Sequence, residues 1–141
     1  MKTAILILML SAVAASADTL TTVALTVWGE ARSESYNGKY AISSVIWNRS
    51  LGRPENFKKV CLAPSQFSCW RHRRFSQPMP DLRKPLDRLA WRDCVTLATL
   101  MMDGEFLPSL DSKHYHEASI QPYWSVNMKM LAKIDGHKFY R

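Results

Sequence analysis

Apolar residues recur at spacings of three and four in the early part of the chain, which is the pattern of an amphipathic helix. They are Leu20, Val23, Ala24, Val27 and Ala31. Glu30 follows Val27 by three residues and Val23 by seven, so it falls on the inward stripe of that helix. The pattern therefore predicts a helix that carries one carboxyl group toward the interior.

Two further helices are predicted downstream. One covers about residues 37–50, and Gly38 near its start lets another backbone approach closely. The other covers residues 85–103, because proline suits the first helical turn and Gly104 follows the last position of the helix. We expect this last helix to pack in the core.

The segments between and after these helices differ in composition. Residues 51–84 are rich in proline, basic and aromatic residues, and the prolines exclude long helices, so we expect binding loops. Residues 113–116 and 133–140 have an extended pattern, and Asp135-Gly136 is a good tight-turn pair. The predicted fold class is α+β, mainly helical, with a small antiparallel β element near the C-terminus.

The N-terminal segment and the length set the expected domain organisation. Lys2, an apolar run over residues 4–14 and the small-residue site Ala15-Ser16-Ala17 predict an export signal over residues 1–17. The run is shorter than the roughly 20 residues that span a bilayer, so we expect no stable membrane anchor after signal removal. A slowly released anchor is the alternative. Residues 18–141 have room for one compact domain.

The formal net charge of +7 suggests an anionic partner. Outside the cytoplasm the candidates are cell-wall polymers, anionic membrane surfaces and free nucleic acid. The densest positive patch is Arg71-His72-Arg73-Arg74, which is either part of a binding surface or a solvated loop.

Three cysteines lie in a chain that we expect in an oxidising compartment. They are Cys61, Cys69 and Cys94. The simplest expectation is one disulfide and one remaining thiol, and the spacing does not say which pair forms the disulfide. No neighbouring histidine singles out a catalytic thiol.

Glu30 is the candidate proton donor. A carboxyl group in apolar surroundings resists ionisation and is able to protonate a leaving oxygen, as glycosidic cleavage requires. The alternative is that Glu30 lies at the polar edge of its helix, or forms a structural ion pair with Arg32 or Arg49. The spacing alone leaves both interpretations open.

An ordered set of short motifs gives the chain a family resemblance. The set comprises Gly29-Glu30-Ala31-Arg32, Glu34, Gly38-Lys39, Asn48-Arg49, Pro64-Ser65-Gln66-Phe67-Ser68, His114-Tyr115-His116, Pro122-Tyr123-Trp124 and Gly136-His137-Lys138-Phe139-Tyr140. In this order the motifs resemble the cell wall hydrolase family typified by the spore cortex-lytic enzyme SleB, including relatives encoded by bacterial viruses. The similarity runs from about Val23 to Arg141.

The resemblance implies a peptidoglycan hydrolase of lysozyme-related architecture, with residues 18–141 as catalytic domain and Glu30 as catalytic acid. It implies cleavage between N-acetylmuramic acid and N-acetylglucosamine, by lytic transglycosylation as in the spore-cortex members. The implied location is extracytoplasmic, in the periplasm or cell wall. Peptidoglycan is the expected partner, with no nucleic acid, no cofactor and no metal, and we expect a monomer.

Transglycosylation suits a sequence with one candidate acid. An ordinary glycosidase needs two carboxylates, about 5 to 5.5 Å apart in retaining enzymes or about 6.5 to 9.5 Å in inverting ones. A lytic transglycosylase needs one, which protonates the glycosidic oxygen and then takes the proton of the muramyl hydroxyl that closes on the anomeric carbon. Glu34 lies between serines typical of a turn or cap, so we expect a supporting role for it.

Gln66, Phe67 and Ser68 are expected to face the substrate. An amide and a hydroxyl bond sugar hydroxyls and N-acetyl groups, while an aromatic face stacks on a pyranose. The alternative is a buried turn anchored by Phe67.

Further candidates for substrate binding lie near the C-terminus. They are His114, Tyr115, His116, Tyr123 and Trp124. Large aromatics are also common in cores. His114 and His116 alternate on a strand and share a face, which His137 could join, and this gives a zinc-dependent amidase as an alternative, although the spacing matches no zinc signature. Another alternative, from the charge and the tryptophans, is a wall-binding module without catalysis.

One segment departs from the family pattern. Ser109-Leu110-Asp111-Ser112-Lys113 precedes the His-Tyr-His motif, where the family usually has a small-residue stretch with glycine. The shape of this loop, and any substrate contact from that side, therefore does not carry over from the family.

Overall fold

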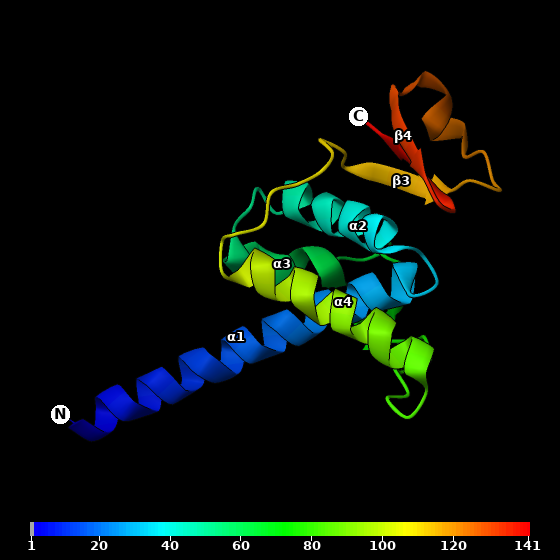
Figure 1. Ribbon diagram of the computed structural model, residues 1–141. Coiled ribbons are helices and arrows are strands. Elements are labelled where there is room, and N and C mark those ends of the chain that lie inside the picture. Colours follow the sequence, from blue (N-terminus) through cyan, green and yellow to red (C-terminus); the bar gives the residue numbers. More distant parts are fainter. Residues whose placement is uncertain (1) are drawn as a thin grey trace.

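The computed structural model describes residues 2–141 and has a helical body with a small β-sheet against one side (Figure 1). Over these residues the helices are α1 (Lys2–Ala31), α2 (Tyr36–Arg49), α3 (Pro54–Leu62), α4 (Pro85–Met102) and a short 3₁₀ helix, η1 (Tyr123–Asn127). The strands are β1 (Trp70–Arg71), β2 (Arg74–Phe75), β3 (His114–Glu117), β4 (Met130–Ile134) and β5 (His137–Tyr140). The predicted class, α+β with dominant helices, is confirmed.

The two later helices, α2 and α4, lie close to their predicted bounds. The expected loops of residues 51–84, by contrast, contain α3 and the β1–β2 hairpin, which the proline-based argument missed. Pro54 stands in the first turn of α3, where a missing backbone N–H costs nothing. The buried side of this short helix is formed by Phe57, Cys61 and Leu62.

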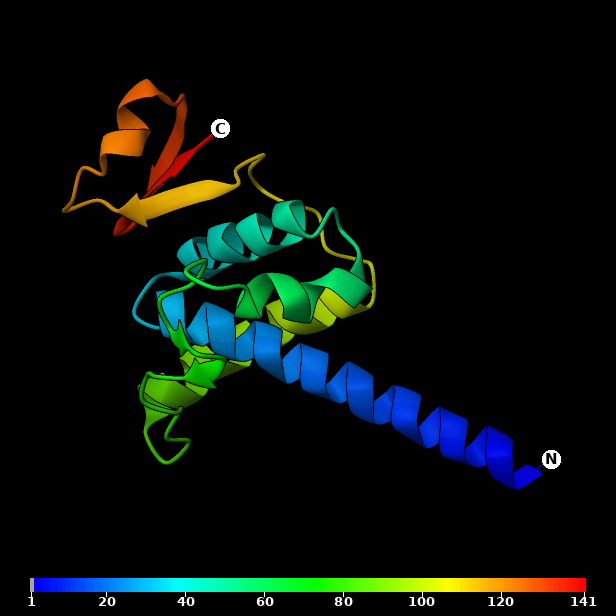
Figure 2. The same ribbon diagram turned by 180° about the vertical axis from the view of Figure 1, so that it is seen from behind.

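The main core lies where α1 crosses α4 and α3, as the view from behind in Figure 2 shows. Val23, Val27 and Trp28 of α1 are buried there, together with Leu97 and Met101 of α4. Burial of one such side chain contributes about 1.5–3 kcal/mol to folding. The apolar stripe predicted for the first helix is therefore confirmed as a core face.

The C-terminal strands form a three-stranded antiparallel sheet in the order β3-β5-β4. Asp135, with a φ of 48°, makes the turn between β4 and β5, so the predicted turn and sheet are confirmed. Phe139 of the central strand packs against Ala41, Ile42 and Val45 of α2 in a second buried cluster. This contact seats the sheet on the helical body.

Polar bonds fix the β4–β5 turn to the connection between α1 and α2. The Asp135 carboxylate accepts hydrogen bonds from the backbone N–H of Ser35 at 2.9 Å and from its hydroxyl at 2.6 Å. The Glu34 carboxylate accepts the backbone N–H of Gly136 at 3.1 Å, and the buried Lys39 ammonium donates to the Glu34 carbonyl. These bonds give Glu34 the supporting role expected for it.

The first half of α1 extends away from the rest of the protein (Figures 1 and 2). Among the described side chains of this helix, packing against the core begins at Leu20. Met1, where the predicted export signal starts, lies outside the described residues, and the signal stays a prediction. No helix within residues 2–141 is long and apolar enough to cross a membrane.

The expected disulfide is not present among the described residues, where all three cysteines are free and buried. Each occupies the helical core as a small apolar group. Burial raises the pKa of Cys61 and of Cys94 to about 12, which keeps both thiols protonated. The expectation was wrong because it rested on the cysteine count and the compartment, whereas packing fixes where these side chains lie.

Asp135 yields a prediction about stability and pH. The hydrogen bond from Ser35 lowers the pKa of Asp135, so its carboxylate stabilises the fold above the usual aspartate pKa of about 3.9, and this contribution is lost as the pH falls through the lowered folded-state value. Asp135→Asn should reduce the free energy of unfolding at pH 7 by about 1 kcal/mol, a modest loss because the site is exposed. The difference from wild type should shrink as the pH falls below the usual aspartate pKa of about 3.9.

Urea unfolding at a series of pH values measures this difference. Asp103→Asn, at the exposed aspartate that follows α4, is the matched control and should leave stability almost unchanged. A difference between wild type and Asp135→Asn that does not vary with pH would contradict the prediction.

Candidate active site

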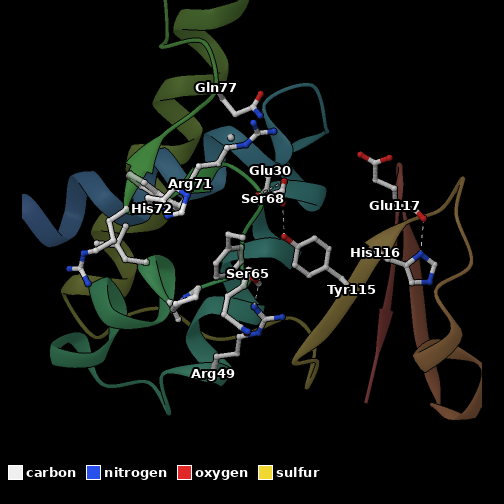
Figure 3. A pocket seen from close by; sticks show the side chains of 18 of the residues that line it. Glu30, Arg49, Ser65, Ser68, Arg71, His72, Gln77, Tyr115, His116 and Glu117 are labelled. Atoms are coloured by element: carbon white, nitrogen blue, oxygen red, sulfur yellow. Dashed lines mark hydrogen bonds between the residues drawn. The ribbon is translucent and has the colours of Figure 1, made fainter.

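A cavity of about 920 Å³ opens beside the C-terminal end of α1 (Figure 3). Its walls come from the last turn of α1, from residues 62–73 and from β3. In Figure 3, Glu30 and Ser68 lie between the hairpin residues Arg71 and His72 on one side and Tyr115 on the other. The cavity therefore joins parts of the chain that are far apart in sequence.

The carboxylate of Glu30 is partly buried in this wall and accepts three hydrogen bonds. Oε1 accepts the backbone N–H of Cys69 at 3.0 Å and the hydroxyl of Ser68 at 3.2 Å. Oε2 accepts the phenol of Tyr115 at 2.7 Å. Partners from the loop and from the sheet thus orient both oxygens at the cavity surface.

Glu30 forms no ion pair with Arg32 or Arg49 in the described structure. The Arg32 guanidinium lies over the ring of Trp28, 5.9 Å from its centroid. Arg49 donates to the carbonyl of Lys113 at 2.8 Å and lies 5.0 Å from the ring centroid of Phe67. Desolvation lowers the pKa of Arg49, but a guanidinium keeps its charge, so Arg49 adds a cation to the cavity wall.

Close backbone packing at Gly29 brings the loop to Glu30. A Cβ at this position would lie 2.4 Å from Cys69 Cβ and 3.0 Å from a ring carbon of Phe75, so only glycine leaves room for the hairpin base. The Trp70 indole N–H also donates to the hydroxyl of Thr26 at 2.9 Å. Glycine before the glutamate therefore lets the Cys69 backbone reach the carboxylate.

Tyr115 reaches Glu30 from β3. Its ring packs between Phe67 and Phe139, with centroid distances of 6.4 and 5.9 Å. Desolvation, and next the Glu30 charge, raise the pKa of Tyr115 well above its usual range. The phenol therefore remains a neutral donor to the carboxylate at every physiological pH.

The expected substrate loop reaches the cavity, but its three residues do not play equal parts. Gln66 and Ser68 are exposed and line the cavity, and the Ser68 hydroxyl, which donates to Glu30, can still accept a hydrogen bond from a polar group there. Phe67 is only 2% exposed and its ring is covered by Arg49, so it does not offer a face to a sugar. Phe67 is therefore a buried residue that anchors the turn, which was the alternative interpretation.

The C-terminal candidates divide between the two faces of the sheet. The pairing of Tyr115 with Phe139 and of Glu117 with His137 places these four side chains on the face toward the helices and the cavity. His114 and His116 alternate with them on the opposite face, where both contact Trp124, at ring centroid distances of 5.9 and 5.6 Å. His116 Nε2 also lies 2.9 Å from the hydroxyl of Tyr140.

Of these candidates, Tyr115 and His116 border the cavity, although the His116 ring packs against Trp124 and Tyr140 on the opposite face, whereas His114, Tyr123 and Trp124 do not border it. Trp124 packs against Tyr140 and the histidines, and Tyr123 is 88% exposed on η1. The sequence does not tell which face of the sheet meets the helices, so it did not separate the candidates that line this cavity from those that lie away from it.

His137 does not join the other two histidines, since it faces Tyr115 with a ring centroid distance of 5.4 Å. Its buried Nδ1 lies 3.4 Å from Glu34 Oε1 without a hydrogen bond to it. Within residues 2–141 no group of three or more His, Cys, Asp or Glu side chains is placed to hold a metal ion. The histidine site required by the zinc alternative is therefore not assembled.

Several cavity residues were missed by the sequence reasoning. They are Trp70, Gln77 and Glu117. A second hollow of about 450 Å³ adjoins the first, and Gly29, Glu30 and Gln77 line both. The sequence around these residues gives no sign that they belong to the site. They come close to Glu30 only because the folded hairpin and sheet bring distant segments of the chain together.

Comparison with protein families gives one match. A family model described as Cell Wall Hydrolase matches residues 33–140. No curated protein sequence matches the chain.

Two solved structures share the fold. One is the catalytic domain of the Bacillus cereus SleB protein, with a TM-score of 0.59, 21% sequence identity, and coverage of 87% of this chain and 89% of that one. The other is the catalytic domain of the germination-specific lytic transglycosylase SleB from Bacillus anthracis, with a TM-score of 0.60, 21% identity, and coverage of 87% and 93%. At this identity the likeness concerns the fold.

The packing at Gly29 yields a prediction. Gly29→Ala should lower the free energy of unfolding by about 1–3 kcal/mol, because the added methyl group overlaps the Cys69 side chain. In a chain that also carries Cys69→Gly, the alanine should cost much less, since the overlapping atoms are gone. Denaturant unfolding of the two single variants and the double variant measures the coupling. Equal costs in both backgrounds would contradict this account.

Proposed function

The chain belongs to the cell wall hydrolase family, and on that premise we propose that it cleaves the glycan strand of peptidoglycan. The proposed bond is the one between N-acetylmuramic acid and N-acetylglucosamine, and the proposed reaction is lytic transglycosylation. Glu30 is the proposed acid and base. The observation that carries the proposal is an oriented carboxyl group, at the surface of a large cavity, with hydroxyl partners on both of its oxygens.

The partners of Glu30 suit a group that must give up a proton and take one back. The hydroxyls of Ser68 and Tyr115 donate to the carboxylate, and either can turn to accept when the carboxyl group is protonated. The Cys69 backbone N–H can only donate, so it fixes the orientation of the group in both states. The same side chain is therefore supported as acid and as base.

The reaction then proceeds in two steps. Protonated Glu30 gives its proton to the glycosidic oxygen, and the bond from that oxygen to the muramyl anomeric carbon breaks, which frees the glucosamine hydroxyl. The muramyl 6-hydroxyl then attacks the anomeric carbon and loses its proton to the Glu30 carboxylate. The product is a 1,6-anhydromuramyl end, and the enzyme returns to its starting protonation state.

Glu117 is the other carboxylate on the cavity wall. It is exposed at the end of β3 and pairs with His137 across the sheet. A hydrolytic mechanism would require such a second carboxylate as base or nucleophile. We assign the reaction to Glu30 alone, which makes Glu117 the discriminating residue.

The proposed location is extracytoplasmic, with residues 1–17 removed as an export signal. Support comes from the fold, because described packing of α1 begins at Leu20, after the proposed cleavage site. The domain would keep the buried part of α1 after cleavage.

Substitution of the two carboxylates tests the function. Glu30→Gln should lower product release from purified peptidoglycan by about 100-fold or more while the fold persists, because the amide cannot protonate the oxygen. Glu117→Gln should change the rate only a few-fold. Mass analysis of the products should find 1,6-anhydromuramyl ends.

Other products or variant effects would point to a different activity. Reducing muramic ends together with loss of activity in Glu117→Gln would replace transglycosylation by hydrolysis. Released stem peptides would indicate an amidase, and binding without soluble product would indicate a wall-binding module. Undiminished cleavage by Glu30→Gln would refute the assignment of the acid.

The phenol on Glu30 gives a second prediction. Tyr115→Phe keeps the packed ring but removes the donor to Oε2, so kcat should fall about tenfold with little change in KM. Tyr123→Phe, which alters an exposed phenol away from the cavity, is the control and should have no effect. A change in KM alone for Tyr115→Phe would show that the phenol binds substrate instead of orienting Glu30.

A further inference from the structure

We propose that the β1–β2 hairpin is a subsite for the carboxylates of the peptide stem that muramic residues carry. The inference rests on the proposed function and names the part of the substrate that the hairpin contacts. The basic tip is defined here as Arg71, His72, Arg73 and Arg74, all of which are exposed. Three of them, Arg71 to Arg73, line the same cavity as Glu30.

The conformation of the basic tip is one that its residues disfavour. Arg71 pairs with Arg74, which leaves His72 and Arg73 as a two-residue turn with φ values of 48° and 64°. Such turns strongly prefer asparagine and glycine, because side chains with a Cβ are strained there. Here the turn instead carries an imidazole and a guanidinium, so local chain stability does not explain the residues found at it.

The base of the hairpin is held firmly beside the carboxylate. Trp70 and Phe75 pack edge to face, with ring centroids 5.2 Å apart, and Trp70 bonds Thr26 of α1. The backbone N–H of Ser76 donates to the Cys69 carbonyl at 2.9 Å, and the Cys69 N–H donates to Glu30. The basic tip therefore keeps a fixed position relative to the proposed reacting group.

The charges of the basic tip have no acidic partner among residues 2–141. Three arginines elsewhere do have one, since Arg83 pairs with Asp81, Arg92 with Asp93 and Arg141 with Asp111, whereas Arg32, Arg53 and Arg88 have none in that part of the chain. Arg49 adds a further cation to the cavity wall, also without a carboxylate partner in the described chain. The cavity thus presents three guanidinium groups, those of Arg49, Arg71 and Arg73, and two carboxylates, those of Glu30 and Glu117, with no ion pair among them.

This arrangement selects the chemical class of the ligand. A guanidinium binds a carboxylate through two parallel hydrogen bonds. In peptidoglycan the muramic residue bears a peptide with free carboxylates, whereas the glucosamine residue bears no charge. Because Glu30 and the basic tip share one cavity, the anion must belong to a sugar next to the cleaved bond. Stem carboxylates fit this position on every repeat, whereas phosphate polymers are attached only to scattered muramic residues.

The test compares two substrates prepared from one batch of phosphate-free peptidoglycan. One keeps its free stem carboxylates, and in the other these carboxylates have been converted to amides with a carbodiimide and ammonia, so that the stems remain but carry no negative charge. For the wild-type chain, kcat/KM should be about tenfold higher on the strands with free carboxylates than on the amidated strands, and added salt should reduce this ratio. The double variant Arg71→Gln/Arg73→Gln should lose most of the preference, while Arg83→Gln/Arg92→Gln should keep it.

Binding separates this inference from the proposed function. The catalytically silenced Glu30→Gln variant should sediment with strands that have free carboxylates more than with amidated strands, and the addition of Arg71→Gln/Arg73→Gln should remove the difference. Equal binding to both materials, or equal loss on both in the double variant, overturns the subsite. A dependence of binding on the basic tip that is found only for sacculi retaining phosphate polymers also overturns it. If binding depends on the free stem carboxylates but the wild-type chain cuts no strand, the proposed function fails and the subsite stands.

Discussion

The backbone contact between the end of α1 and the loop before the β1–β2 hairpin is the constraint on which the site depends. Gly29 has no side chain, so Cys69 approaches the helix and its N–H reaches the Glu30 carboxylate at 3.0 Å. Glu30 lies at the C-terminal end of α1, where the free backbone groups are carbonyls and not N–H groups. A backbone donor for its carboxylate therefore has to come from another segment. One missing methyl group therefore positions the acid, the loop and the basic tip together.

The sheet supplies the other half of the site. Phe139 fixes β5 on α2, and the turn at Asp135 is tied to Ser35 at the start of that helix. Neighbouring β3 then presents Tyr115 to Oε2 at 2.7 Å. The helical body and the sheet thus hold one carboxylate between them, and a displacement of either would change the direction in which its proton is offered.

Local pattern was sufficient for much of this architecture. Periodicity and end signals predicted α2, α4 and the β4–β5 turn. The faces of the sheet were not predictable, because alternation puts His114 and Tyr115 on opposite sides without saying which side meets the helices. Trp70 and Gln77 were missed for a related reason. They lie in or next to the hairpin, and the hairpin is positioned by the contact between Cys69 and Glu30, which are about 40 residues apart in the sequence.

The three buried thiols have a consequence for the environment in which the domain works. A thiol exchanges or oxidises as the thiolate, and burial raises the pKa of Cys61 and Cys94 to about 12, far from any ambient pH. In the native state the reactive thiolate form of these two cysteines is scarcely populated, so they react slowly with an oxidant or with glutathione disulfide. These two thiols are therefore poor partners for disulfide exchange, and the core that holds them keeps its packing without a cross-link.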